Sequence, residues 1–273
     1  MRKRGAYRIE VERGTELFVQ DLGQGRPVVL IAGFGLDHQV WDAQVRRLAG
    51  AGHRSVCIDL RGTGHSDKPL GGYELPQLAS DVRKVIEELD LHDATLAGWS
   101  FGGQVSFAVA AQIPDRIAQL VLIASNGVRA SRSDEFPFGR PPEETEPALI
   151  GAEKNGRLQA RRETIAAAFH GKPDPELLDW LVGISLQMPS WAAVACYRSM
   201  LRGDLLTELH RITMPVLQVY GSGDPAHTGR GAQWVSEQLL DSRIVQLDDC
   251  GHYPMFEATE AFDAALLGFV SER

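Results

Sequence analysis

The chain has 273 residues, of which 44% are hydrophobic and 23% are charged, a composition typical of a folded globular protein and unlike that of a disordered one. Its 28 basic and 36 acidic residues give a formal net charge of −8, which disfavours binding to nucleic acid or to an anionic membrane. The sequence shows neither the run of about 20 apolar residues that would span a membrane nor the apolar segment of a secretion signal, so we expect a cytoplasmic protein.

Short apolar runs bounded by Gly, Pro and Asp predict eight β-strands. The first two are expected to form an antiparallel pair around the turn at Arg13-Gly14. The later runs are nearly all apolar and rich in β-branched residues, as expected of parallel strands that are buried on both faces. The predicted strands are residues 7–11, 16–21, 28–32, 55–59, 94–97, 120–124, 216–220 and 244–247.

Helical patterns separate these strands. The apolar residues of segment 75–89 lie on one face of a helix, and segment 101–111 is apolar nearly all round, which predicts a buried helix that ends before Pro114. Strands and helices that alternate in this way predict an α/β fold, with a mostly parallel and doubly wound sheet.

One long region interrupts this alternation. No strand is predicted between residues 124 and 214, and the region is too long for a loop. It begins polar and rich in proline and then shows helical patterns at 158–170, 175–188 and 191–201. The sequence therefore predicts a core formed by residues 1–126 and 211–273, with an inserted helical cap (lid) at 127–210.

The three cysteines match no metal-binding spacing. Cys57, Cys196 and Cys250 lie far apart and are odd in number, so they are predicted to be reduced structural thiols.

The predicted strand at 94–97 leads into the sequence Gly-Trp-Ser-Phe-Gly at residues 98–102. This is the G-x-S-x-G pattern in its strand–turn–helix setting. The turn is so tight that Ser100 must be strained and that larger residues in place of Gly98 and Gly102 would clash. Its hydroxyl would stand at the positive end of a helix, where a developing anion is stabilised. We predict that Ser100 is a nucleophile; the alternative is a structural turn.

A serine hydroxyl needs a base, and His252 is predicted to be that base. Among eight histidines, it is the one that lies in a glycine-flanked turn directly after a late strand. Asp224 follows the strand at 216–220 and is predicted to accept a hydrogen bond from the imidazole, fixing its tautomer. A structural histidine and a turn-forming aspartate are the alternatives.

Two backbone amides are predicted to receive the negative charge that develops on a carbonyl oxygen. One belongs to Phe101, the residue after the nucleophile, and the other to Phe34, in the loop Ala32-Gly33-Phe34-Gly35. Glycines in this loop let the backbone approach a substrate closely, although they are also compatible with a plain turn.

With these motifs, the sequence resembles the serine-nucleophile branch of the α/β-hydrolase superfamily over nearly its whole length. Residues 59–66 are similar to the D-x-R-G-x-G-x-S segment of the family, and residues 251–257 to its G-H-x-P-x-x-E segment. The order Ser, Asp, His is also that of the family. The resemblance implies an eight-stranded sheet, the α/β-hydrolase fold, with a helical cap.

Two departures from the family pattern bear on the chemistry. Ala32 stands where members usually carry a histidine, which should be tolerated because the oxyanion donors are backbone groups. The haloalkane dehalogenase and epoxide hydrolase branches use an aspartate nucleophile, so Ser100 argues against both.

The motifs and the resemblance together predict a serine esterase that cleaves an ester or lactone of a small, largely apolar substrate through an acyl-enzyme on Ser100. Neither a metal nor an organic cofactor is expected. The substrate pocket is predicted between the sheet edge and the cap, lined by Gly33, Trp99, Met188 and Trp191. The expected partner is a small molecule rather than a nucleic acid or a membrane, and homo-oligomer formation stays open.

Three other functions stay open: a carbon–carbon bond hydrolase of the meta-cleavage-product type, a cofactor-free dioxygenase, and a ligand receptor that keeps the triad. His38 motivates the dioxygenase, because a histidine in this region occurs in dioxygenases of this fold; a loop or helix-start residue is the alternative. The arginines of the cap are interspersed with glutamates and predict a solvated surface of mixed charge; they are Arg129, Arg132, Arg140, Arg157, Arg161 and Arg162.

Overall fold

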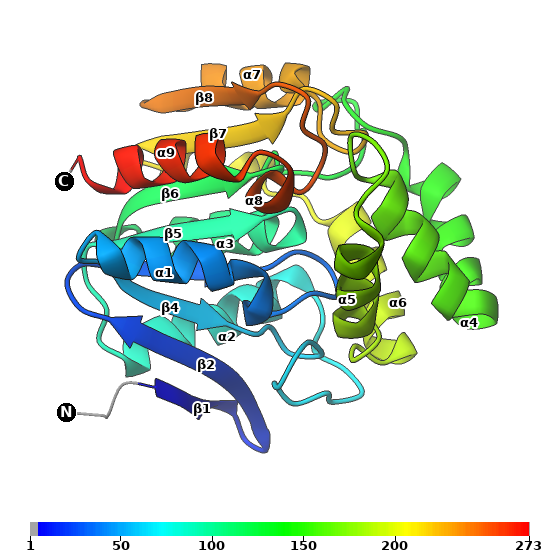
Figure 1. The fold of residues 1–273 in the computed structure, drawn as a ribbon, viewed down its shortest axis with the longest axis horizontal. Coiled ribbons are helices and arrows are strands. Elements are labelled where there is room, and N and C mark those ends of the chain that lie inside the picture. Colours follow the sequence, from blue (N-terminus) through cyan, green and yellow to red (C-terminus); the bar gives the residue numbers. More distant parts are fainter. Residues whose placement is uncertain (1–4, 273) are drawn as a thin grey trace.

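The computed structural model describes residues 5–272, so residues 1–4 and 273 of the predicted core lie outside it. An eight-stranded sheet forms its centre, in the order β1-β2-β4-β3-β5-β6-β7-β8 (Figure 1). Strand β2 pairs antiparallel with both of its neighbours, and the other pairs are parallel. The strands are β1 (Gly5–Glu12), β2 (Thr15–Gly23), β3 (Pro27–Ile31), β4 (Arg54–Ile58), β5 (Ala94–Trp99), β6 (Ile117–Ile123), β7 (Val216–Gly221) and β8 (Ser242–Leu247).

Helices cover both faces of the sheet, because the side chains of each strand alternate between them. Val29 and Ile31 of β3 belong to the core on the side of α2, α3 and α7, whereas Val28 and Leu30 belong to the core on the side of α1 and α9. The sheet is thus doubly wound. These helices are α1 (Asp42–Gly50), α2 (Leu75–Glu88), α3 (Phe101–Gln112), α7 (Gly229–Gln238), α8 (Pro254–Glu257) and α9 (Thr259–Val270), with short 3₁₀ turns η1 (His38–Trp41) and η2 (Pro114–Arg116).

The predicted fold class is confirmed. Each of the eight apolar runs lies within or overlaps one strand, and the predicted ends differ from the observed ones mainly where strands begin with polar residues, as in β6 and β8. Helix α3 is buried along almost its entire length, as its uniformly apolar sequence indicates.

Helices fill the region between β6 and β7, and they lie over the carboxyl ends of the parallel strands (Figure 1). They are α4 (Pro142–Ala167), α5 (Pro175–Ser185) and α6 (Ser190–Arg202), followed by the 3₁₀ turn η3 (Leu206–Arg211). The sequence predicts that the first of these helices begins at residue 158, and this prediction is wrong. Helix α4 starts at Pro142, where proline is tolerated because the first helical residues need no amide donor.

A kink at Gly156 divides α4 into two parts. Its backbone angles, φ −162° and ψ 41°, are not helical, and the interruption hides the long helix from a search for continuous periodicity. The boundaries of the cap at residues 127 and 210 stay a prediction. Within residues 5–272, no helix is both long enough and apolar enough to cross a membrane.

Candidate active site

Ser100 lies in a sharp turn between β5 and α3. Its backbone angles are φ 56° and ψ −121°, in a region that residues other than glycine rarely adopt. A Cβ atom on Gly98 would overlap the carbonyl oxygen of Gly102, and one on Gly102 would overlap that of Ala32. Both glycines are therefore required by close backbone contacts, and the turn presents the Ser100 hydroxyl above the carboxyl end of β5.

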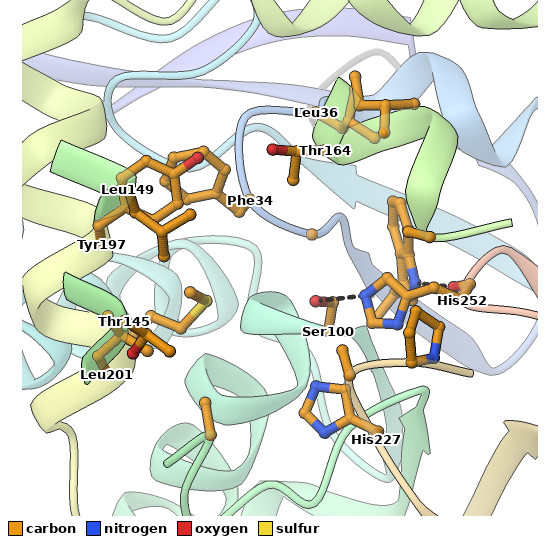
Figure 2. Close-up of a pocket in the computed structure, with 18 of the residues that line it drawn as sticks. Phe34, Leu36, Ser100, Thr145, Leu149, Thr164, Tyr197, Leu201, His227 and His252 are labelled. Atoms are coloured by element: carbon orange, nitrogen blue, oxygen red, sulfur yellow. Dashed lines mark hydrogen bonds between the residues drawn. The ribbon is translucent and has the colours of Figure 1, made fainter. Parts of the chain in front are cut away.

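His252 lies beside Ser100, in the loop that follows β8. Its Nε2 is 2.9 Å from the Ser100 Oγ (Figure 2), and its Nδ1 is 2.8 Å from Oδ2 of Asp224. The backbone of His252 is also fixed, since its carbonyl accepts a hydrogen bond of 2.8 Å from Trp99 Nε1. The three residues that the sequence proposed as a triad thus form one continuous hydrogen-bonded series.

Asp224 follows β7 and is held on both carboxylate oxygens. Oδ1 accepts hydrogen bonds from the backbone amides of Ala226, at 2.8 Å, and His227, at 3.1 Å. Burial alone would raise the pKa of this carboxyl, but the interactions with His252 and with the turn outweigh it, so the pKa of Asp224 lies below its ordinary value. Asp224 is therefore an ionised acceptor in a fixed orientation.

The two predicted oxyanion donors are backbone amides that belong to different segments, one directly after Ser100 and the other in the loop that follows β3. Phe101 is the first residue of α3, and the loop of Phe34 approaches Ser100 so closely that a Cβ on Gly33 would be 3.1 Å from the Ser100 Cβ. Within the part of the chain that the structure describes, neither amide donates a hydrogen bond to a protein acceptor. Both amides are therefore available to donate to a substrate oxygen.

A cavity of about 350 Å³ opens at Ser100, between the sheet edge and the helices above it (Figure 2). Gly33 and Trp99 line it, as predicted from the sequence. The ring of Phe34 stacks on that of Tyr197 with centroids 4.1 Å apart. The remaining wall is largely apolar and includes Leu36, Leu149, Ile165, Met200 and Leu201, with the hydroxyls of Thr145 and Thr164.

Met188 and Trp191 do not line this cavity, so the sequence-based assignment of these two residues is corrected. Met188 is buried in the core next to α6. Trp191 is 47% exposed, and its Nε1 donates to the carbonyl oxygen of Pro69 at 3.1 Å. Helix α6 instead directs Tyr197, Met200 and Leu201 toward the cavity, because these positions lie on its inner face.

The arginines of the predicted cap are not all solvated, contrary to the sequence-based expectation. Arg161 is 3% exposed and lines the cavity. Its Nε and Nη2 bind the carboxylate of buried Glu153 at 2.8 Å and 3.0 Å, and its guanidinium carbon lies 5.5 Å from the centre of the Phe34 ring. Because Glu153 already neutralises Arg161, this arginine supports the wall under Phe34.

His227 also lines the cavity, although the sequence analysis did not select it. Its ring lies nearly parallel to that of His252, with centroids 5.5 Å apart and planes at 16°. Burial lowers the pKa of His227 to about 4, with the neighbouring His252 acting in the same direction and Asp224 opposing it. Its position three residues after Asp224, in the same turn, was the available signal.

The lowered pKa of His227 predicts an acid-sensitive stability. Between about pH 6.5 and pH 4 the unfolded chain binds a proton at this residue and the folded chain does not, so stability falls as the pH falls through this range. The midpoint of thermal unfolding should decrease on acidification more in the wild-type protein than in His227→Phe, by up to roughly 5 °C per pH unit. Thermal unfolding of both proteins at pH 7 and pH 5 measures the difference, and equal slopes would contradict it.

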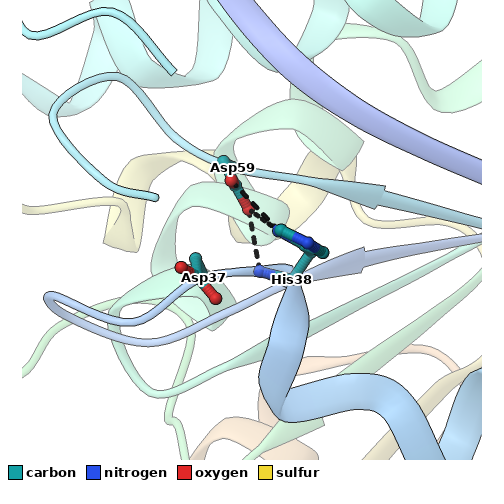
Figure 3. A group of neighbouring side chains, drawn as sticks. All are labelled: Asp37, His38 and Asp59. Atoms are coloured by element: carbon teal, nitrogen blue, oxygen red, sulfur yellow. Dashed lines mark hydrogen bonds and ion pairs between the residues drawn. The ribbon is translucent and has the colours of Figure 1, made fainter. Parts of the chain in front are cut away.

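His38 is part of a separate buried cluster with Asp37 and Asp59 (Figure 3). One carboxylate oxygen of each aspartate and one ring nitrogen of His38, the kinds of atom that bind metal ions, lie within 4.8 Å of one another. The Asp59 carboxylate, however, already accepts hydrogen bonds from the His38 amide at 2.7 Å, from its Nδ1 at 3.0 Å and from the His65 amide at 2.9 Å. The cluster joins the loops that follow β3 and β4, and His38 is absent from the cavity wall.

A doubly wound sheet with a strained serine after its fifth strand, and with aspartate and histidine after its last two, defines the class as α/β hydrolases. The family model described as alpha/beta hydrolase fold matches residues 26–259, and the chain belongs to this family.

Three known proteins illustrate the range of similarity. A non-heme chloroperoxidase from Streptomyces lividans is 30% identical over 269 residues, which are 94% of this chain and 96% of that protein. The structure of the esterase EaEST from Exiguobacterium antarcticum has a TM-score of 0.94 at 26% identity and covers 99% of this chain and 100% of its own. The enol-lactonase from Burkholderia xenovorans LB400 has a TM-score of 0.84 at 25% identity, over 95% and 98%.

Proposed function

We propose that the protein is a carboxylic ester hydrolase that acts on an ester or lactone of a small, largely apolar molecule through an acyl-enzyme on Ser100. The observation that carries this proposal is the hydrogen-bonded series from Asp224 through His252 to Ser100. Ser100, at one end of this series, lines a largely apolar cavity. The similarity to an esterase and to an enol-lactonase supports the same chemistry.

In the acylation step, Nε2 of His252 takes the proton of the Ser100 hydroxyl as its oxygen attacks the ester carbonyl. Asp224 keeps the proton of His252 on Nδ1 and stabilises the imidazolium that forms. The carbonyl oxygen becomes an anion, which the amides of Phe34 and Phe101 stabilise. His252 then returns the proton to the departing alcohol oxygen, and the acyl group stays on Ser100.

In the deacylation step, His252 takes a proton from a water molecule, which attacks the acyl carbonyl. The same two amides stabilise the second anion, and the proton returns to Ser100 as the acid leaves. A lactone follows the same course, with its alcohol and acid released as one molecule. All steps use groups of this chain, water and a small-molecule substrate.

The cavity indicates the substrate class. Its volume of about 350 Å³ is at the lower end of the range for sites that enclose small molecules. The stacked rings of Phe34 and Tyr197 and the surrounding aliphatic side chains favour a hydrocarbon portion. We therefore expect short acyl or alcohol groups to be better substrates than long ones.

Covalent trapping of the nucleophile tests this proposal. A fluorophosphonate should modify the wild-type protein once, on Ser100, as identified by mass spectrometry of the peptides. Ser100→Ala should not react, whereas Ser271→Ala, which alters an exposed serine after α9, should react fully. Wild-type protein should also release p-nitrophenol from p-nitrophenyl butyrate with a burst of acylation. Oxygen uptake, or tight ligand binding without turnover, would instead favour the dioxygenase or the receptor.

A further inference from the structure

The side chain of His227 has no hydrogen-bond partner among residues 5–272, although it lies at the wall of the active site. Its Nδ1 is buried and unpaired, and no described residue binds its Nε2. Its ring stacks on His252, and its hydrogen bonding to the described residues is through the backbone amide, which donates to Asp224 at 3.1 Å. The turn that holds Asp224 therefore requires an amide at this position but no imidazole.

An imidazole that only filled space here would be unfavourable, because an unpaired buried polar group costs roughly 1–3 kcal/mol. A flat apolar ring would stack on His252 as well and would avoid that cost. The nitrogens are thus expected to have a partner that arrives from the cavity, which both His227 and Ser100 line (Figure 2).

Several polar groups lie on this side of the nucleophile. A small chamber of about 10 Å³ adjoins Ser100; His227, Gln104, Ser125 and Arg129 line it together with the apolar side chains of Phe101, Ala130 and Met200. The Nε2 of Gln104 is also buried without a partner. On the other side of Ser100, Phe34 and Tyr197 form an apolar wall. A substrate that matches both sides has a polar group next to the reacting carbon and hydrocarbon beyond it.

We propose that His227 determines specificity by hydrogen bonding to a hydroxyl group that the substrate carries close to the scissile ester bond. A neutral imidazole offers one donor and one acceptor, and a hydroxyl can pair with either of them whichever tautomer is present. This inference rests on the proposed ester hydrolysis and adds the class of substrate, hydroxylated esters or lactones.

Two pairs of esters test the inference, because the hydroxyl can belong to the acyl or to the alcohol portion. In the first pair, p-nitrophenyl β-hydroxybutyrate and p-nitrophenyl isovalerate differ by a hydroxyl in place of a methyl group on the acyl chain. In the second, ethylene glycol monobutyrate and propyl butyrate differ in the same way on the alcohol. For each pair, the ratio of kcat/KM of the hydroxylated ester to that of its apolar analogue is measured.

In the wild-type protein we expect one of these ratios to exceed one, and in His227→Phe we expect it to fall about ten-fold or more, mainly through KM. His227→Gln, which keeps a donor and an acceptor, should recover part of it. His53→Phe is the matched control, since the Nδ1 of His53 is likewise buried and unpaired, but His53 precedes β4, at the opposite end of the strands. Its ratios should stay within about three-fold of the wild type.

Ratios that stay within about three-fold in both His227 variants would overturn the inference and would mean that water is the partner of the imidazole. A fall of equal size in His53→Phe would also overturn it, because the effect would then be a general one. If the wild-type protein hydrolyses none of the four esters, the proposed function itself fails, so the two failures are distinguishable. Thermal unfolding of each variant establishes that it is folded. If His227→Phe does not fold, the ratios of His227→Gln are compared with those of the wild type instead.

Discussion

Replacing Ser100 by alanine should lower kcat for the hydrolysis of p-nitrophenyl butyrate by about three or more powers of ten, and His252→Ala should have a similar effect. Without the Ser100 Oγ no acyl-enzyme can form. Without the His252 imidazole, the serine hydroxyl keeps its proton, because no other base lies within hydrogen-bond distance of that hydroxyl among the described residues. Steady-state rates of the purified variants, corrected for the uncatalysed reaction, measure both effects.

The double variant provides the sharper test. Ser100 and His252 act on the same proton. The kcat of Ser100→Ala/His252→Ala should therefore be no lower than that of the less active single variant, and the two losses of activation free energy should not add. His92→Ala is the control, because His92 is an exposed histidine that pairs with Asp90 far from the site. Independent and additive losses would indicate that the two residues contribute to separate steps, against the proposed mechanism.

The sheet could be predicted from the sequence because its signals are local. Strands such as β3 and β5 are short, apolar and bounded by glycine, proline or charged residues, and burial on both faces accounts for their composition. The sharp turn at Ser100 could be located for the same reason, since the strand, the turn and the helix that define it are contiguous in the chain.

The walls of the cavity could not be predicted, because they depend on how helices are rotated against the sheet. Trp191 and Tyr197 lie on the same helix, α6, but only Tyr197 faces the cavity. The pair of Arg161 and Glu153 is a second example. These residues are eight apart, about 12 Å along a straight helix, and the kink at Gly156 between them is what permits the contact.

Changing Asp224 to asparagine should lower kcat by about four powers of ten, although the two side chains have nearly the same shape. The reason lies in the turn. The amides of Ala226 and His227 both donate to Oδ1, so the oxygen of an asparagine must occupy that position, since its NH₂ group would face two donors. The NH₂ group then faces Nδ1 of His252.

An asparagine NH₂ group donates rather than accepts, so it favours the tautomer of His252 that carries its proton on Nε2. That proton would point at Ser100, and the imidazole could no longer take the serine proton. Asp224→Ala leaves the tautomer free and should therefore be at least as active as Asp224→Asn, which an argument from shape alone would not predict. Asp249→Asn is the matched control, because the side chain of Asp249 is 96% exposed, and its kcat should stay within about three-fold of the wild type. If Asp224→Asn kept a tenth of the wild-type kcat, the two backbone hydrogen bonds would not control the orientation of this residue, and the assignment of Asp224 as the residue that orients His252 would be wrong.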